Sequence, residues 1–282
     1  MIVKKEILRP FKQLSILLMI LVSFASTQAF AQDAAPADAT ATSLYNEGLA
    51  ALKEKDNENG YLKMVAAWEK AKEEKNDKVL SLAEKNGAIA AYKRGLDLLK
   101  DKNNDGALEV ALKGLEINPK YSSLYMVKGK ALEEKEDVAG AIDAMMMYAS
   151  LAKEEADEKK VGDAFARSKN MLVRTYNDKK YEEVTKVGEV ILENDKNADA
   201  AYLVGKAYDE LGNKEKAIEK LNASIDISTA AGEAIDDKVY YALGLVYESA
   251  GIKDKAIEVL KKITDEKYKA SAEYKVQQLG SN

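Results

Sequence analysis

The side chains that could do chemistry in this chain are almost all carboxylates and amines, because its 282 residues include no histidine and no cysteine. A serine triad of the common type and a thiol nucleophile are therefore excluded. Zinc sites with histidine or thiolate ligands and haem with its usual axial ligands are excluded for the same reason. The glycines are isolated and do not cluster before a lysine, so no phosphate-binding loop is predicted.

Paired carboxylates are the chemistry that remains, and Glu133-Glu134 and Asp236-Asp237 are two such pairs. A hydrolase that uses two carboxylates needs burial or close charges to shift the pKa of one of them. Both pairs lie in charged, turn-like or solvent-facing stretches, so we expect solvated surface groups, no enzymatic activity and no cofactor. A carboxylate-dependent hydrolase on a helical scaffold is a remote alternative, which turnover of glycans or phosphoesters would reveal.

Three consecutive methionines, Met145 to Met147, could supply soft ligands to copper. Consecutive residues point in different directions around a helix, however, so the three sulfur atoms would not converge. We therefore expect these side chains to pack between helices and predict no metal site.

The elements that must position these side chains are indicated by small residues at a constant spacing. An alanine follows a glycine by twelve residues at four places: Gly95 and Ala107, Gly129 and Ala141, Gly205 and Ala217, and Gly244 and Ala256. Apolar residues recur every three or four positions on both sides of Gly212, which predicts two amphipathic helices joined by a turn. Gly212 is expected to end the first helix in a left-handed conformation. Gly205 and Ala217 are small enough to let the two backbones approach.

The glycine-to-glycine step of 34 residues from Gly95 to Gly129, together with this texture, resembles tetratricopeptide repeats. The step from Gly205 to Gly244 is slightly longer, as if the loop between hairpins had grown. The resemblance covers most of the chain after about the first forty residues. It implies an all-α fold, a right-handed superhelical solenoid of about five to six helical hairpins with a C-terminal capping helix.

The expected organisation is a signal peptide at residues 1–31, a flexible leader at 32–42 and the solenoid at 43–282. The approximate repeats are 43–75, 84–119, 121–152, 163–195, 198–230 and 237–264, followed by a capping helix at 266–280.

Two of these repeats are less regular copies. The first is predicted to have a longer turn through residues 56–60, and the fourth lacks a glycine in its first helix. The charge-rich segments 73–84 and 153–162 are either connectors or helix extensions.

The N-terminus is predicted to direct export. Basic residues precede an apolar run at 14–24, and Ala29-Phe30-Ala31 gives a small-x-small cleavage pattern before Gln32. The signal resembles a bacterial one, so we expect a periplasmic protein, with the cell exterior as a second possibility and an uncleaved membrane anchor as the alternative. After cleavage no stable membrane insertion is expected. With no cysteine in the chain, a bacterial lipid anchor is excluded.

The net charge of −5 argues against nucleic acid as a partner, because phosphate backbones are bound by clustered lysine and arginine. With catalysis unsupported, the function is expected to lie in binding a protein or peptide. As the resemblance implies, the first helix of each hairpin lines the inner wall of the superhelix.

Candidate groove residues follow from their distance to each leading glycine, as in other tetratricopeptide proteins. They are Tyr92, Leu96, Met126, Lys130, Glu133, Tyr202, Lys206, Asp209, Tyr241, Leu245 and Glu248. Aromatic faces would supply contact area to an extended peptide, and the charged groups would fix its register. The alternative is that the tyrosines pack helix against helix. The two-carboxylate clamp of chaperone-binding family members is not supported, because tyrosine, leucine and methionine stand at the corresponding places.

The sequence therefore predicts an exported, non-enzymatic scaffold or adaptor that binds a protein segment in its groove, in an envelope assembly, secretion or chaperone context. A second hypothesis is an accessory subunit of an envelope complex that associates through its convex face or its ends. The oligomeric state and the partner stay open. The same repeat serves many unrelated roles.

Overall fold

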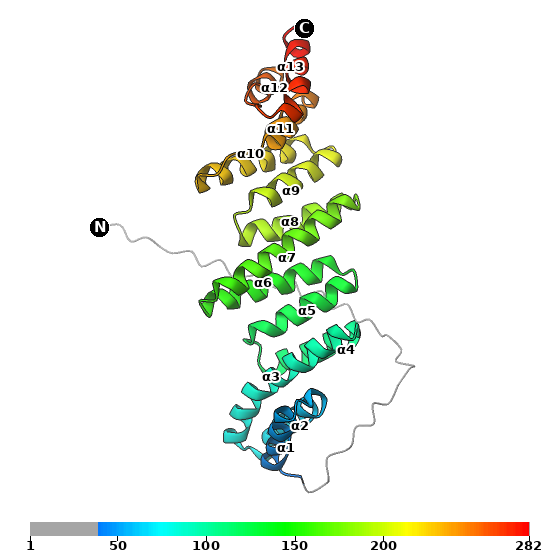
Figure 1. The fold of residues 1–282 in the computed structure, drawn as a ribbon, viewed down its shortest axis with the longest axis vertical. Helices are drawn as coiled ribbons and strands as arrows, with labels where there is room; N and C mark the ends of the chain where they lie inside the picture. The colour runs from blue at the N-terminus through cyan, green and yellow to red at the C-terminus, as the bar shows by residue number, and fades with distance from the viewer. Residues whose placement is uncertain (1–38, 282) are drawn as a thin grey trace, which may run out of the picture. The chain divides into compact units, whose positions relative to one another are not determined.

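The computed structural model describes residues 39–281, and this part of the chain consists of α-helices joined by short turns, with no strand (Figure 1). The expected signal peptide and residues 32–38 of the expected leader lie outside the described residues. None of the described helices combines the length and apolar character that crossing a bilayer requires.

Twelve of the thirteen described helices form six consecutive hairpins, and the thirteenth follows them. The hairpins are α1 (Ala41–Lys53) with α2 (Asn57–Glu74), α3 (Asp77–Lys100) with α4 (Asn104–Ile117), α5 (Ser122–Glu134) with α6 (Val138–Glu154), α7 (Glu158–Asn177) with α8 (Tyr181–Asn194), α9 (Ala198–Glu210) with α10 (Lys214–Ala231), and α11 (Asp237–Ser249) with α12 (Lys253–Leu260), before α13 (Glu266–Gly280).

Each helix packs on the next one along the chain, and first helices of successive hairpins also touch, as α3 touches α5 and α7 touches α9. The predicted all-α solenoid of about five to six hairpins with a closing helix is confirmed, and the described residues form six.

All six hairpins turn in the same way, with three residues between the helices and a left-handed residue in the middle. Gly212 has φ of 77° and Gly251 of 76°, as expected for glycine. The other four hairpins place Lys55, Lys102, Glu136 and Lys179 in this conformation, with φ between 59° and 64°. In four hairpins the third turn residue is Asp or Asn, and its side chain accepts a hydrogen bond from the start of the second helix: Asp56, Asn103, Asp137 and Asn213.

Glycine in the first helix lets the second helix approach. A Cβ atom on Gly205 would lie 2.8 Å from Leu221 Cγ and 3.1 Å from the Leu221 backbone nitrogen, which confirms why this position is small. Gly244 is packed in the same way against Leu260, sixteen residues further along the chain. The large residue of the second helix therefore fills the space that the glycine leaves.

The first hairpin follows this rule, and its predicted long turn is wrong. Residues 57–60 form the first turn of α2, because the Asp56 carboxylate accepts a hydrogen bond from the Asn59 N–H at 3.0 Å and starts the helix there. Gly60 is buried and follows Gly48 by twelve residues, the place that alanine takes elsewhere. The helix α1 begins at Ala41, inside the expected leader, because the Thr40 hydroxyl caps it.

The fourth hairpin keeps the packing rule with the sizes reversed. Leu172 in α7 takes the place of the glycine, and Gly188 in α8 takes the place of the large residue. A Cβ atom on Gly188 would lie 3.4 Å from Leu172 Cδ1 and would overlap Val204 of α9. The missing glycine that made this copy look irregular is thus in the partner helix.

The charge-rich segments are mainly helix extensions, since α3 begins at Asp77 and α7 at Glu158, each well before the expected repeat start. The three methionines behave as core residues in part: Met145 and Met146 are buried, whereas Met147 is 45% exposed. Packing rather than ligation therefore accounts for the first two.

Candidate peptide-binding groove

The eleven candidate groove residues all lie on first helices, and each is half-buried. Tyr92, Met126, Tyr202 and Tyr241 each lie eight residues before the last residue of their helix, so they are structurally equivalent. We call the surface formed by these eleven residues and their equivalents on α7 the first-helix face.

The fourth hairpin contributes three equivalents that counting from a glycine does not find. Measured from the end of α7, they are Lys169, Val173 and Tyr176. Val173 is 37% exposed. Burial is the main cause that raises the pKa of Tyr176 to about 12, with the nearby carboxylates of Glu210 and Asp209 adding to it. Counting from the turn instead of the glycine would have found these positions in the sequence.

A hollow on the N-terminal half of this face lies between α3, α5 and α7. We call it the basic pocket; it has a volume of about 510 Å³ and is lined by Leu96, Leu99, Lys100, Lys102, Asn104, Lys130, Glu134 and Arg167. Two of the candidate residues, Leu96 and Lys130, are therefore brought together in one concave site.

Lys130 is the most perturbed cation of the basic pocket. Burial lowers its pKa below the usual lysine range, and the Arg167 guanidinium lowers it further, while Glu133 and Asp163 act in the opposite direction. Among the described residues no ion pair involves Lys130, Lys100 or Lys102. The pocket thus holds positive charge that its own walls do not neutralise.

Glu133 is not exposed as the sequence suggested, because its side chain is only 10% exposed and is held by two arginines of α7. Arg167 Nε donates to it at 2.6 Å, and Arg174 donates to its other oxygen. Arg167 follows Glu133 by 34 residues, one repeat length, so opposite charges at the repeat spacing were the signal that could have predicted this contact. Glu133 therefore links the third and fourth hairpins and is not free to bind a ligand.

The tyrosines of the face contact neighbouring first helices or the segment before them. The Tyr92 and Tyr121 rings meet edge-to-face with centroids 6.1 Å apart, and the Tyr241 ring lies 5.4 Å from that of Tyr268 in α13. Lys238 Nζ lies 5.3 Å from the Tyr202 ring centroid. Burial raises the pKa of the Tyr202 hydroxyl. Met126 packs against two core clusters, one between the second and third hairpins and one that extends from the third hairpin to the fifth.

The charged candidates of the C-terminal half also have partners within the chain. Lys206 Nζ lies 5.9 Å from the Tyr176 ring centroid, and Asp209 pairs with Lys214 at 2.5 Å. Glu248 pairs with Lys275 of α13 at 2.5 Å. Leu245 lies between Tyr241 and Glu248 on α11 and is half-buried.

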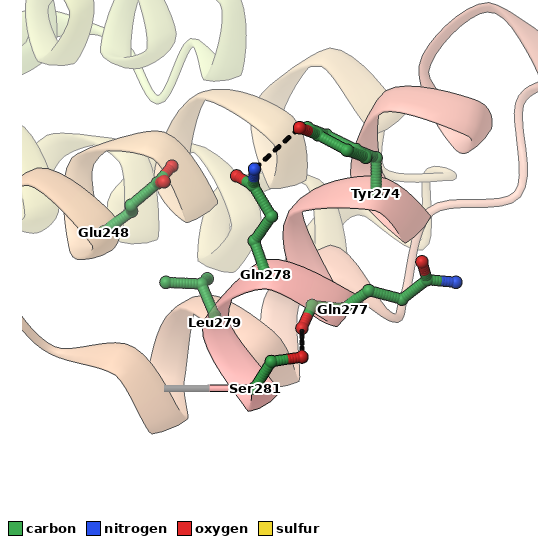
Figure 2. A pocket seen from close by; sticks show the side chains of 6 residues that line it. All are labelled: Glu248, Tyr274, Gln277, Gln278, Leu279 and Ser281. Carbon is green, nitrogen blue, oxygen red and sulfur yellow. Dashed lines mark hydrogen bonds between the residues drawn. The ribbon is translucent and has the colours of Figure 1, made fainter.

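Helix α13 borders the last first helix, and a second hollow of about 450 Å³ lies where α11 and α13 meet (Figure 2). Glu248 is its contribution from α11, and Tyr274, Gln277 and Leu279 are among those from α13. Tyr274 is 60% exposed, and its hydroxyl accepts a hydrogen bond from Gln278 at 2.7 Å.

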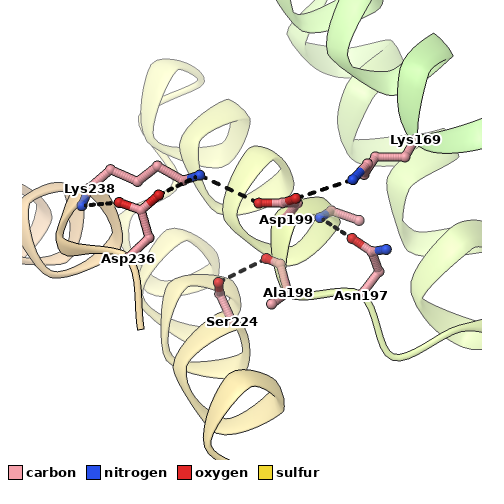
Figure 3. A network of polar contacts seen from close by, with 8 residues as sticks. Lys169, Asn197, Ala198, Asp199, Ser224, Asp236 and Lys238 are labelled. Atoms are coloured by element: carbon pink, nitrogen blue, oxygen red, sulfur yellow. Dashed lines mark hydrogen bonds and ion pairs between the residues drawn. The ribbon is translucent and has the colours of Figure 1, made fainter. Parts of the chain in front are cut away.

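A polar network between Lys169 in the second half of α7 and residues at the starts of α9 and α11 ties the fourth, fifth and sixth hairpins together (Figure 3). Asp199 of α9 pairs with Lys169 at 3.3 Å and with Lys238 at 3.5 Å. Lys238 also pairs with Asp236 at 2.9 Å. One member of the acidic pair at 236–237 therefore caps α11 and joins an ion network, and the other, Asp237, accepts hydrogen bonds from the backbone N–H groups of Thr264 and Asp265. The described residues contain no acidic cluster placed to share a metal ion.

The fifth and sixth hairpins match a family model. Residues 198–230 and 237–269 each match the tetratricopeptide repeat, and the other hairpins have the same turn and the same helix pairing. The chain therefore contains tetratricopeptide repeats at residues 198–230 and 237–269. Curated protein sequences give no significant match.

Solved tetratricopeptide repeat structures resemble the fold of this chain at low identity. YrrB, described as a TPR protein with an unusual peptide-binding site, is 19% identical over 62% of this chain and 84% of its own, with a TM-score of 0.37. The P58(IPK) TPR domain is 15% identical over 86% of this chain and 64% of its own, with a TM-score of 0.38. The TPR2AB domain of yeast Sti1 in complex with a pHSP90 is 12% identical over 85% of this chain and 98% of its own, with a TM-score of 0.36. These likenesses concern the fold alone.

Proposed function

We propose that this chain is a non-enzymatic scaffold that binds a segment of another protein on its first-helix face, and that the basic pocket is where binding is centred. The observation that carries the proposal is that Leu96 and Lys130 line an open hollow of about 510 Å³ between three successive first helices. Apolar surface beside unpaired charge offers both contact area and register to a bound segment. The other candidate residues, among them Tyr202, Lys206 and Asp209, would flank the bound segment further along the face.

Site-specific crosslinking in the intact cell tests this proposal. A photoreactive residue replaces Leu96 in the basic pocket of the full chain, and in a matched variant it replaces Leu112 of α4, a second-helix position that is 48% exposed. We expect one protein to be captured from position 96 and not from position 112. Equal capture from both positions, or no capture from position 96, would remove the groove from the proposal.

A second candidate is association through the second helices. Leu62, Leu112 and Met147 lie on α2, α4 and α6 and are 48%, 48% and 45% exposed, respectively. If these side chains lie close enough to form one apolar patch, they would suit an accessory subunit that binds through the second helices. Capture from position 112 alone in the same experiment is the result expected for this candidate.

Export to the bacterial periplasm completes the proposal and is supported by the basic, apolar and small-residue pattern of residues 1–31. Such a protein would serve envelope assembly, secretion or a chaperone system. Mass spectrometry of the protein recovered from the periplasmic fraction should show Gln32 as its first residue. Recovery of the uncut chain with the membranes would contradict cleavage and favour the anchor.

A further inference from the structure

The basic pocket has a surplus of positive charge in a chain that is acidic as a whole. Lys100, Lys102, Lys130 and Arg167 line it, against the single carboxylate of Glu134, whereas the net charge of the chain is −5. A local reversal of sign inside a concavity concentrates ligands of the opposite charge.

The nearby carboxylates do not cancel this surplus. Glu133 is held between Arg167 and Arg174, so that group of three still carries one positive charge. Asp163, which also acts on Lys130, pairs with Lys159 at 2.5 Å. Glu134 is exposed and forms no ion pair among the described residues. The lowered pKa of Lys130 agrees with this geometry, because a cation that is partly removed from water and lies beside another cation lacks compensation.

Two leucines give the pocket an apolar part. Leu96 and Leu99 of α3 line it, both half-buried, and both pack against the core cluster between the second and third hairpins. A ligand that fits has a carboxylate for the lysines and an apolar group for the leucines. Acidic side chains next to apolar ones in an extended protein segment provide both, whereas the phosphate backbone of a nucleic acid provides only charge and would meet the negative field of the rest of the chain.

We propose that the basic pocket recognises an acidic segment of the partner protein, with an Asp or Glu side chain between Lys100, Lys130 and Arg167 and an adjacent apolar side chain on Leu96 and Leu99. This inference rests on the proposed function and names the chemistry of its partner. The pocket thereby selects acidic, partly apolar segments over neutral ones.

Measuring how tightly peptides bind to the purified protein, expressed from the full chain, tests the inference. The probes are a fluorescent short peptide of Glu, Leu and Ser, the same peptide with every Glu replaced by Gln, and inorganic phosphate as a competitor. We expect the Glu peptide to bind, the Gln peptide to bind at least tenfold more weakly, and the affinity to fall as salt is added. Equal binding of both peptides would overturn the inference.

Three variants locate the binding. K130Q removes a cation that forms no ion pair in the described part of the chain, and it should weaken binding of the Glu peptide about tenfold. K186Q, the same change at an exposed position on α8, should have no effect. E134Q removes the carboxylate of the pocket wall and should tighten binding, a gain that an unfolded variant cannot produce. If K186Q weakened binding of the Glu peptide as strongly as K130Q, or if E134Q did not tighten it, the charge effect would lie outside the pocket.

The remaining outcomes separate this inference from the proposed function. Capture of a partner from position 96 in cells, combined with no preference for the Glu peptide, would leave the scaffold in place and reject the acidic segment. Displacement of the Glu peptide by phosphate at equal concentration would also reject it, because the pocket would then recognise charge without the apolar contact.

Discussion

The N-terminal and C-terminal halves of the first-helix face use equivalent positions differently. Between α3 and α7, Leu96 and Lys130 line an open basic pocket, and the lysines there form no ion pair with any residue from 39 to 281. Between α9 and α13, Tyr241 lies against Tyr268, and Glu248 pairs with Lys275. The hollow of the C-terminal half therefore has its carboxylate neutralised by the chain itself.

A repeat position therefore sets the direction in which a side chain points, but not whether that side chain is free to bind a ligand. Whether the side chain can bind a ligand depends on the charge of the side chains that the next helix of the face places beside it. Lys130 faces a second cation, Arg167, whereas Glu248 faces a lysine. The same position in the repeat can thus be a binding residue in one hairpin and a tether in another.

The largest expected effect lies at the junction of the two halves, where α8 meets α9. G188A adds a methyl group that overlaps Val204, so we expect the free energy of unfolding to fall by about 2 kcal/mol in urea denaturation followed by circular dichroism. G162A is the control, because no other described part of the chain comes within 4 Å of its Cβ position in α7, and it should stabilise the chain by about 1 kcal/mol through helix propensity. If G188A stabilised as well, the close packing of α8 on α9 would be wrong.

The next effect concerns the tether beneath the open half. E133Q removes the carboxylate that holds Arg167 and Arg174 and should lower the free energy of unfolding by about 2 kcal/mol, because the partners become unpaired and Glu133 is largely buried. E134Q, one residue away and exposed, should change stability by less than about 0.5 kcal/mol. Thermal unfolding of the two variants side by side makes the comparison. Equal effects would mean that the arginine contacts contribute nothing.

A smaller effect is expected from opening the closed half. Y268A removes the ring that covers Tyr241 and should destabilise α13 by about 1 to 2 kcal/mol, seen as faster hydrogen exchange in residues 266–280 with little change before α11. Y274A is the matched control, since that ring is 60% exposed. Exchange that stays slow in Y268A would show that α13 is held by other contacts, such as the pair between Lys275 and Glu248.

The smallest effect tests the turns, which also differ between the halves. G212A puts a side chain at φ of 77° and should cost about 1 kcal/mol. K102G relieves the same left-handed position in the second hairpin and should gain about 0.5 kcal/mol. Denaturation midpoints of both variants check the pair. A loss of stability in K102G would indicate that the lysine side chain supports the turn by contacts of its own.

The hairpins were predictable because each depends on local chemistry. Helical periodicity, the Gly212 turn and the alanine twelve residues after glycine are all satisfied within one hairpin. The first and fourth hairpins were harder to recognise, since Gly60 takes the place of an alanine and Gly188 exchanges size with Leu172. In both cases the structure constrains the combined size of two facing side chains. A search for one residue type does not detect such a constraint.

The candidate face was predictable as a set of positions, because the repeat fixes which side of each first helix faces its neighbours. Which of these positions are free and which are paired within the chain was not predictable. Whether Glu133 is free or paired depends on Arg167, which is 34 residues away and comes close only when two hairpins stack.

The stack of helical hairpins and the lack of histidine or thiol chemistry follow from the sequence alone, because helix periodicity, turn residues and composition act locally. Which charges stay unpaired depends on the tertiary structure. Ion pairs and ring contacts between successive first helices form across distances that the chain closes only on folding, so the basic pocket between α3, α5 and α7 appears when three hairpins are in place.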